Sequence, residues 1–423
     1  MMNFIVQNRA ILSSILFTLI TGQVSNARDE AHGGRSPIPH FDLDMTGAEW
    51  EKVLKGPTGP TFPIQSPLDE VLRFGKRNLD WLRVINDHRD DKVSFTSEAT
   101  QAAHPIDDPI EYNETLIMQA YGDLIQHLPA RMRAVLVEQA PMTEDPGLDL
   151  LEYLSWGRKA DVVYQKAARW LIMQRYLDYL KSRRSEDVRG YYNLRKDTER
   201  EEHFAEFNSL SDAQKKTYSD WLLGICMNAR QTQEDCAQEL KQAILDQKVN
   251  SFYAKYFHDA EDNWNSFFDI PQDRKYPEIL WDSRQPNLTR IAFMEPETEE
   301  RRQFLQSNIQ DEWRWLGWAL QIDFSPSRGV LVKWQEGITP HVDHFSNTIF
   351  MDANSPLTEY NVRWTIRHEF GHILGFPDCY LEFYDEDRAV MVQYQLDITD
   401  LMCSRRGKLK ERHWLELQRN YLH

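Results

Sequence analysis

The sequence predicts an α+β protein in which a large all-α region precedes a smaller domain of mixed helices and strands. Apolar residues recur at helical spacing from Leu68 to about Phe268, as they do between Leu240 and Tyr256. The alternation of apolar and polar residues that is typical of strands begins only after residue 286. A chain of 423 residues is long enough for two or three such domains.

Composition and charge exclude several classes of protein. Hydrophobic residues make up 41% of the chain and charged residues 27%, which excludes both disorder throughout and a multi-span membrane protein. Acidic residues outnumber basic ones by 66 to 49, the net charge is −17, and the sequence has no concentrated basic stripe. Because such a chain repels a polyanion, we expect no nucleic acid among its partners.

Residues 1–27 are predicted to be a signal peptide. One positive charge in Met1–Arg9 precedes Ala10–Ile20, an apolar run of the length of a signal-peptide core. Ser25 and Ala27 are the small residues that precede a cleavage site. The alternative is an uncleaved anchor, but the run is shorter than the ~20 apolar residues of a spanning helix. The mature protein is therefore expected to be secreted, into the extracellular space or the periplasm, and to leave the membrane.

Export to an oxidising compartment predicts that the four cysteines form two disulfides. Four cysteines allow three connectivities. We favour the pairing in which each bond closes one local segment, which joins Cys226 to Cys236 and Cys379 to Cys403.

The composition divides the mature chain into four parts. Residues 28–65 are rich in Gly, Pro and His and are expected to form an extended leader with little core of its own. Residues 66–270 are expected to form a helical domain, whose aromatic stripes indicate packing between antiparallel helices. Residues 271–286 contain three prolines among polar residues and are predicted to be a linker. Residues 287–423 form the mixed domain.

The mixed domain is expected to contain several strands and two helices. Its strands are predicted from alternating patterns, and its first helix from apolar residues that share one face. In order, we expect a strand at Ile291–Phe293, a helix from Phe304 to Leu320, strands at 321–324, 330–334 and 347–351, and a helix from about Glu359.

The second of these helices carries a sequence with metal-ligand spacing. His368 and His372 are four residues apart, so both imidazoles project from one helical face and can bind one metal ion. Gly375 can end the helix in a left-handed turn, after which Asp378 can return to the same ion as a third ligand. Two nitrogens and one oxygen leave a fourth position open, which is typical of a catalytic zinc. Glu369 can then reach a metal-bound water without being a ligand. The alternative is an ordinary amphipathic helix with two exposed histidines.

The sequence His-Glu-x-x-His-x-x-Gly-x-x-Asp resembles the signature of the metzincin zinc proteases, with aspartate in place of the third histidine, as in the snapalysin group of small secreted bacterial proteases. Leu401-Met402-Cys403 resembles the Met-turn of that family, whose methionine lies beneath the zinc ligands. The resemblance implies a protease domain with a twisted mixed sheet and an active-site helix. It also implies that the strand at 347–352 is the edge strand above the cleft, which binds an extended substrate. The sequence after Met402 lacks the tyrosine that some metzincins place there, so no tyrosine ligand is expected.

These features predict a secreted zinc-dependent endopeptidase that acts on proteins or peptides, with one catalytic Zn²⁺ and Glu369 as the general base. The alternative is a non-catalytic secreted binding protein, in which the helical domain binds the partner and the metal is structural. The helical domain is either a propeptide that covers the cleft, removed by a cut near Arg284, or a permanent accessory domain.

Four other histidines and one acid are weaker candidates. His341, Asp343 and His344 either bind a second ion or form a solvated polar loop, and we favour the polar loop. His413 and His423 are expected to lie on the surface.

Overall fold

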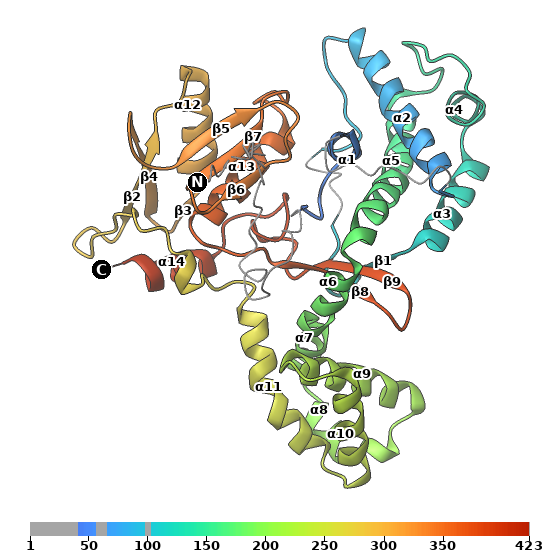
Figure 1. Ribbon diagram of the computed structural model, residues 1–423, viewed down its shortest axis with the longest axis vertical. Helices are drawn as coiled ribbons and strands as arrows, with labels where there is room; N and C mark the ends of the chain where they lie inside the picture. Colours follow the sequence, from blue (N-terminus) through green and yellow to red (C-terminus); the bar gives the residue numbers. More distant parts are fainter. Residues whose placement is uncertain (1–40, 56–65, 98–102, 423) are drawn as a thin grey trace, which may run out of the picture.

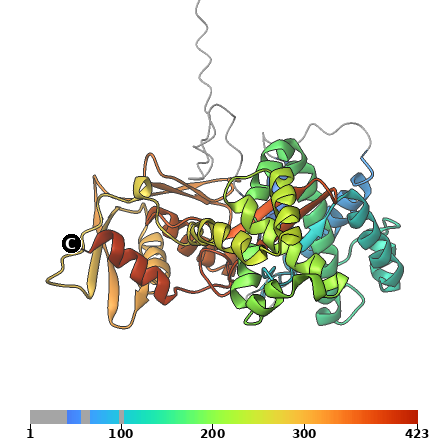
Figure 2. The same ribbon diagram turned by 90° about the horizontal axis from the view of Figure 1, so that it is seen from below.

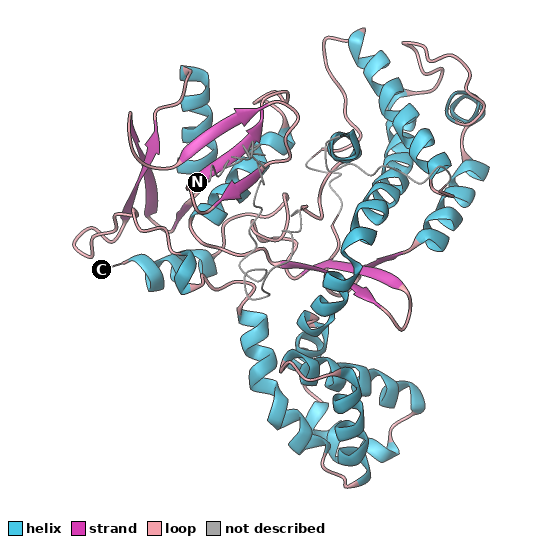
Figure 3. Ribbon diagram, in the orientation of Figure 1, coloured by secondary structure: helices cyan, strands magenta, loops and turns pink. Residues whose placement is uncertain are grey.

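The structure is a computed structural model that describes residues 41–55, 66–97 and 103–422. The predicted signal peptide and residues 28–40 and 56–65 of the predicted leader lie outside these residues. The described chain contains helices and several small sheets, which confirms the α+β class (Figure 1 and Figure 3). Among the described helices, none is both long enough and apolar enough to serve as a membrane span.

The first group of helices packs around one long central helix, α5. Its buried aromatic residues include Trp50, Trp81 and Tyr164. A Cβ atom at Gly75 would lie 2.3 Å from Tyr164, so this glycine lets α2 approach α5 closely. The group comprises α1 (Gly47–Lys55), α2 (Asp69–Asp87), α3 (Glu114–His127), α4 (Ala130–Leu136), α5 (Leu150–Met173) and α6 (Leu177–Ser182). The expectation that the leader is extended is wrong for residues 47–55, because α1 buries Trp50 in this core.

A second group of helices forms a separate lobe, which lies below the rest of the molecule in Figure 1. The apolar residues of this lobe belong to the same continuous core as the C-terminal domain, whereas the first group has its own core. The helices are α7 (Arg189–Lys196), α8 (Arg200–Ala205), α9 (Asp212–Asn228), α10 (Gln233–Leu245) and α11 (Val249–Asn265). Helical periodicity shows which residues are buried but not which helices share a core, so residues 66–270 were expected to form one domain.

The sheet of the C-terminal domain is mixed. Strands β2 and β4 are parallel, as are β5 and β7, and a bridge between Phe293 and Val330 joins the two pairs. Strands β3 and β6 are antiparallel to their neighbours β4 and β7. The strands are β2 (Leu288–Met294), β3 (Arg314–Trp315), β4 (Trp318–Ser325), β5 (Leu331–Gln335), β6 (His341–Asp343) and β7 (Thr348–Asp352). The strands expected near residues 291, 321, 330 and 347 all form.

The helix expected to run to Leu320 ends early. Helix α12 (Glu299–Leu305) continues for one wider turn to Gln310, and β3 and β4 follow. Between these strands, Leu316 and Gly317 both have positive φ angles, 37° and 89°, and form a two-residue hairpin turn. The apolar residues therefore keep their helical spacing past residue 310, although the chain there forms a hairpin.

The strand at 347–352 is not an edge strand. β7 pairs with β5 on one side and with β6 on the other, so it lies inside the sheet. β6 forms the edge instead. The resemblance to metzincins had placed the edge on β7, and a strand of three residues such as β6 is too short to be predicted from alternation.

A separate sheet joins the two halves of the chain. Strands β8 (Tyr380–Asp385) and β9 (Val390–Gln395) form a hairpin, and β9 also pairs with β1 (Ile110–Tyr112) from the helical region. In Figure 1 this sheet lies where the α1–α5 group meets the rest of the chain. The N-terminal region is therefore not all-α. Figure 2 shows the C-terminal domain and the first helical group on opposite sides of the molecule.

The predicted linker is packed against the C-terminal domain. Tyr276 and Trp281 are buried, and Leu280 pairs with Arg290 of β2 by two backbone hydrogen bonds. The proline content of 271–286 suggested a solvent-exposed connection, but its aromatic residues contribute to the core.

His104 gives the contact between β9 and the helical region an expected pH dependence. Its backbone bonds to Gln395, and burial, together with the nearby Lys166 and Arg169 charges, lowers its pKa to about 4. In the unfolded chain the pKa is ~6.5, so acidification below that value protonates the unfolded state first. We expect the stability from His104 to be complete above pH 6.5 and to be lost as the pH falls towards 4, by about 2 kcal/mol between pH 7 and pH 5.

Denaturant unfolding of wild type and His104→Leu at both pH values measures this difference. The variant should lose less stability on acidification than wild type does. His258→Leu, at a side chain that is 80% exposed, is the matched control and should keep the wild-type pH dependence. Equal pH dependence in His104→Leu and wild type would contradict the assignment.

Candidate metal centre

Helix α13 (Tyr360–Ile373) carries the two histidines of the predicted site. Ile366 and Phe370 are completely buried, and the Phe370 ring contacts Phe293 of β2 and Trp313, with ring centroids 5.8 and 5.4 Å apart. This packing fixes the helix against the sheet. His368 and His372 are also buried, at 4% and 8% exposure, which excludes the alternative of two exposed histidines.

The helix ends in a sharp bend at Gly375. Its φ angle is +90°, and a Cβ atom there would lie 2.8 Å from the carbonyl oxygen of Arg274. Only glycine fits both the left-handed backbone and the close approach. The bend returns the chain towards the helix and brings Asp378 beside the histidines.

Three potential ligand atoms meet at this point. Nε2 of His368 lies 3.1 Å from Nε2 of His372, and Oδ1 of Asp378 lies 3.1 and 3.3 Å from these two nitrogens. Among the residues that the structure describes, these side chains form one of two groups with metal-ligand spacing. The other contains the disulfide-bonded Cys379 and Cys403, whose sulfurs are not available as thiolates.

Backbone carbonyls orient both imidazoles. Nδ1 of His368 lies 3.0 Å from the carbonyl oxygen of Leu401, and Nδ1 of His372 lies 2.8 Å from that of Phe376. A carbonyl only accepts, so each Nδ1 carries the proton and donates it. Each Nε2 of the neutral ring is then left with a lone pair that faces the other ligands.

The donor set fits a zinc ion. Tetrahedral bonds of about 2.0–2.2 Å to nitrogen and oxygen place neighbouring ligand atoms about 3.3–3.5 Å apart, close to the separations observed here. Burial by itself lowers the pKa of His368, but the hydrogen bond with Asp378 and the surrounding negative charges raise it to about 10. The carboxylates around His368 therefore favour a positive charge at this ligand, which a bound metal ion could supply in place of the proton.

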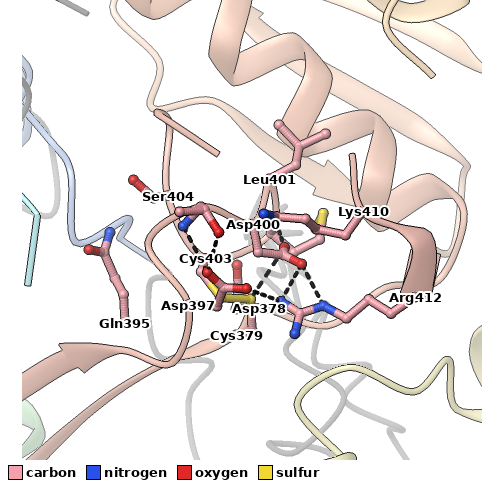
Figure 4. Close-up of a disulfide and its surroundings, with 12 residues drawn as sticks. Asp378, Cys379, Gln395, Asp397, Asp400, Leu401, Cys403, Ser404, Lys410 and Arg412 are labelled. Carbon is pink, nitrogen blue, oxygen red and sulfur yellow. Dashed lines mark hydrogen bonds and ion pairs between the residues drawn. A yellow bond between two sulfur atoms is a disulfide. The ribbon is translucent and has the colours of Figure 1, made fainter. Parts of the chain in front are cut away.

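Met402 lies directly beneath the helix. It is 2% exposed, and a Cβ atom at Gly371 would lie 2.2 Å from its sulfur, so the absence of a side chain at Gly371 makes room for it. The turn that carries Met402 is joined to the Asp378 loop by the Cys379–Cys403 disulfide (Figure 4). The disulfide thus joins the turn of Met402, which was predicted to lie beneath the ligands, to the loop of the third ligand.

The structure pairs all four cysteines as the sequence favours. Cys226 and Cys236 join α9 to α10, with Cα atoms 5.8 Å apart, and the Cα atoms of Cys379 and Cys403 are 4.5 Å apart. Both separations lie in the usual range for disulfides.

Glu369 is buried next to the ligands, at 3% exposure. Its negative charge contributes to the raised pKa of His368 and also raises the pKa of the buried Tyr380. Tyr380 follows Asp378 by two residues, and its hydroxyl lies 3.4 Å from Asp42. Asp42 could not be predicted from the sequence, because it lies more than 300 residues from the motif.

Arg405 connects the N-terminal segment to the turn of Met402. Its guanidinium donates to Asp42 at 2.9 Å and to Glu49 at 2.8 Å, and its backbone N–H donates to Asp44 at 2.6 Å. The side chain of Arg405 is only 4% exposed. No role for Arg405 was expected from the sequence, because its partners Asp42 and Glu49 lie 363 and 356 residues away.

The loop after β6 lies against the site but does not form a second metal group. Nδ1 of His341 contacts the Thr339 carbonyl, and Asp343 accepts from its own loop. His344 lies with its ring centroid 6.4 Å from that of His372, and Nη1 of Arg274 lies 3.4 Å from its Nε2. His344 is thus a neighbour of the proposed zinc site, which its spacing from the motif did not reveal.

His413 was expected to lie on the surface, but it is buried. It is 3% exposed, its ring contacts Trp313 and Phe376, and its Nε2 lies 3.1 Å from the Asp400 carboxylate. It lies on the buried face of α14 (Glu411–Tyr421), which packs on the core. His423 lies outside the described residues.

A cavity of about 520 Å³ lies beside the N-terminal half of α13. Its walls come from α1, α2 and the loop at 92–97 on one side, and from residues 338–340 and β7 on the other. Thr365, one turn before His368, also lines it. The helical region therefore forms part of the surface next to the metal centre.

Comparisons with models of protein families, with curated proteins and with solved structures find no match for this chain.

Proposed function

We propose that this protein is a secreted, zinc-dependent endopeptidase of the metzincin type. The observation that carries the proposal is the buried group of two imidazoles and one carboxylate, oriented by backbone carbonyls, with Glu369 beside it. The mixed sheet with an antiparallel edge strand and the methionine beneath α13 also support it.

His368, His372 and Asp378 would hold the zinc ion. A bound zinc ion supplies a Lewis acid that polarises the peptide carbonyl and lowers the pKa of water. Glu369 accepts the proton of the attacking water and returns it to the departing amine. The outer edge of β6, which pairs with no other described strand, offers backbone hydrogen bonds to an extended peptide. This strand ends at Asp343, and the next residue, His344, lies beside the site.

The alternative, a binding protein with a structural metal, fits the site less well. Structural zinc ions usually have four protein ligands, whereas this group has three. A structural site also has no need of a buried carboxylate such as Glu369 beside its ligands.

Metal analysis combined with casein hydrolysis tests the proposal. We expect about one zinc per chain, casein cleavage that a chelator abolishes, and recovery when zinc is restored. Bound zinc without any cleavage of casein or of a mixed peptide library would favour the binding protein.

We further propose that the helical region is a permanent part of the enzyme. Arg169 of α5 and Glu382 of β8 form a buried two-bond ion pair, with both bonds 2.8 Å long. The pairing of β1 with β9 and the contacts of Arg405 with residues 42–49 add to this interface. Removal of a propeptide would expose all of these groups.

Cleavage within residues 271–286, the segment predicted to be a linker, is therefore not expected to release the helical region. A recognition site for a specific protease, inserted after the exposed Arg284, allows one cut at this position. Both fragments should elute together in size-exclusion chromatography, with unchanged casein hydrolysis. Separation of the fragments together with a rise in activity would instead identify a propeptide.

A further inference from the structure

The turn that carries Met402 is fixed by a buried carboxylate. Asp400 is completely buried, and its Oδ1 accepts a hydrogen bond of 2.7 Å from the backbone N–H of Met402. Its Oδ2 accepts from Nε of Arg412 at 2.7 Å and lies 3.1 Å from Nε2 of His413. Figure 4 shows Asp400 between the disulfide and Arg412. One carboxylate thus joins the turn to the start of α14.

The hydrogen bonds of His413 define its tautomer. Its Nδ1 accepts from the backbone N–H of Lys410 at 2.8 Å, so the neutral ring carries its proton on Nε2 and donates it to Asp400. The ring is held between Trp313 and Phe376, with centroids 6.1 and 5.1 Å away. These contacts leave His413 little freedom to turn.

His413 supports both carbonyls that orient the ligand histidines. Through Asp400 it holds the turn whose Leu401 carbonyl accepts from His368, and through ring contact it holds Phe376, whose carbonyl accepts from His372. We infer that His413, together with Asp400, is a positioning residue for the zinc site. This inference rests on the proposed function, because it concerns the same metal centre.

Replacement of a residue that orients the metal ligands is expected to weaken zinc binding directly, so zinc affinity is the first quantity to measure. Groups that orient metal ligands typically change metal affinity by about 10–100-fold when they are removed. His413→Phe keeps a ring between Trp313 and Phe376 but removes the donor to Asp400. His413→Gln keeps an N–H near the position of Nε2 and is the matched conservative variant.

The full chain, stripped of metal, is titrated with zinc in competition with a chromogenic chelator. We expect His413→Phe to bind zinc about 10–100-fold more weakly than wild type, and His413→Gln to recover most of that loss. The visible spectrum of the Co²⁺-loaded protein should shift in His413→Phe and resemble wild type in His413→Gln. A merely structural role would lower the temperature of unfolding but leave this spectrum unchanged.

Wild-type zinc affinity and an unchanged Co²⁺ spectrum in His413→Phe would overturn the inference. If that variant does not fold, Asp400→Asn replaces one acceptor oxygen at nearly constant shape and should give the same two changes. Failure of the proposed function itself is distinguishable, because wild type would then bind no zinc or cleave no peptide.

Discussion

Replacement of Glu369 by alanine is expected to lower kcat/KM for peptide hydrolysis by about 10²–10⁴-fold, the usual contribution of a general base. The reason is that no other group is proposed to accept the proton of the attacking water. Zinc should remain bound, because Glu369 provides none of the three ligand atoms. The measurements are casein or fluorogenic-peptide kinetics together with the zinc content of the purified variant.

Two further variants make this result specific. Glu369→Gln keeps the size of the buried side chain and should lose as much activity as the alanine variant, which separates loss of the base from a cavity effect. Glu300→Gln changes an exposed carboxylate in the first turn of α12 and should retain full activity. Wild-type kinetics in Glu369→Gln would remove this residue from the mechanism.

The zinc-ligand group was predictable because it is local. The separation of His368 from His372 is fixed by the helical repeat, and the bend at Gly375 is fixed by a backbone conformation that disfavours other residues. Asp378 follows that bend by three residues. The disulfide pairing of Cys379 with Cys403 was also favoured because both cysteines lie in one segment.

The groups around the ligands were not predictable because they come from distant parts of the chain. Asp42 and Arg405 are 363 residues apart, and no spacing rule relates them. His413 lies on a helix whose buried face depends on Trp313 and Phe376, so its sequence neighbours did not show that it is buried. The same limit explains β1, whose three residues form a strand because β9 lies beside them.

The sequence pattern also led to a wrong prediction where a helix and a hairpin fit the same spacing of apolar residues. The apolar residues between Phe304 and Leu320 fit a helix, but Gly317 allows the hairpin turn that divides them. The glycine was the signal that could have corrected the prediction, because a glycine inside an apolar helical pattern weakens it.

Replacement of Arg405 by methionine is expected to destabilise the protein by about 3–5 kcal/mol, the usual cost of removing one partner from a buried ion pair. Methionine fills much of the space but leaves the carboxylates of Asp42 and Glu49 without their shared cation. Asp44, whose pKa burial already raises to about 6, would lose the positive charge that favours its ionised form. We therefore expect residues 41–55 to detach from the turn of Met402 at lower denaturant concentration than in wild type.

Denaturant unfolding of the zinc-loaded protein measures this loss, and the neighbouring Arg406 supplies the control. Arg406 is exposed, so Arg406→Met should change stability by no more than about 0.5 kcal/mol. Both variants lose an arginine, but only Arg405→Met loses a buried one. The difference between their free energies of unfolding therefore measures the effect of removing the buried charge. If both variants unfold at the wild-type midpoint, the contacts of Arg405 contribute no net stability. The helical region would then be held to the metal centre mainly by β1 and by the pair of Arg169 with Glu382.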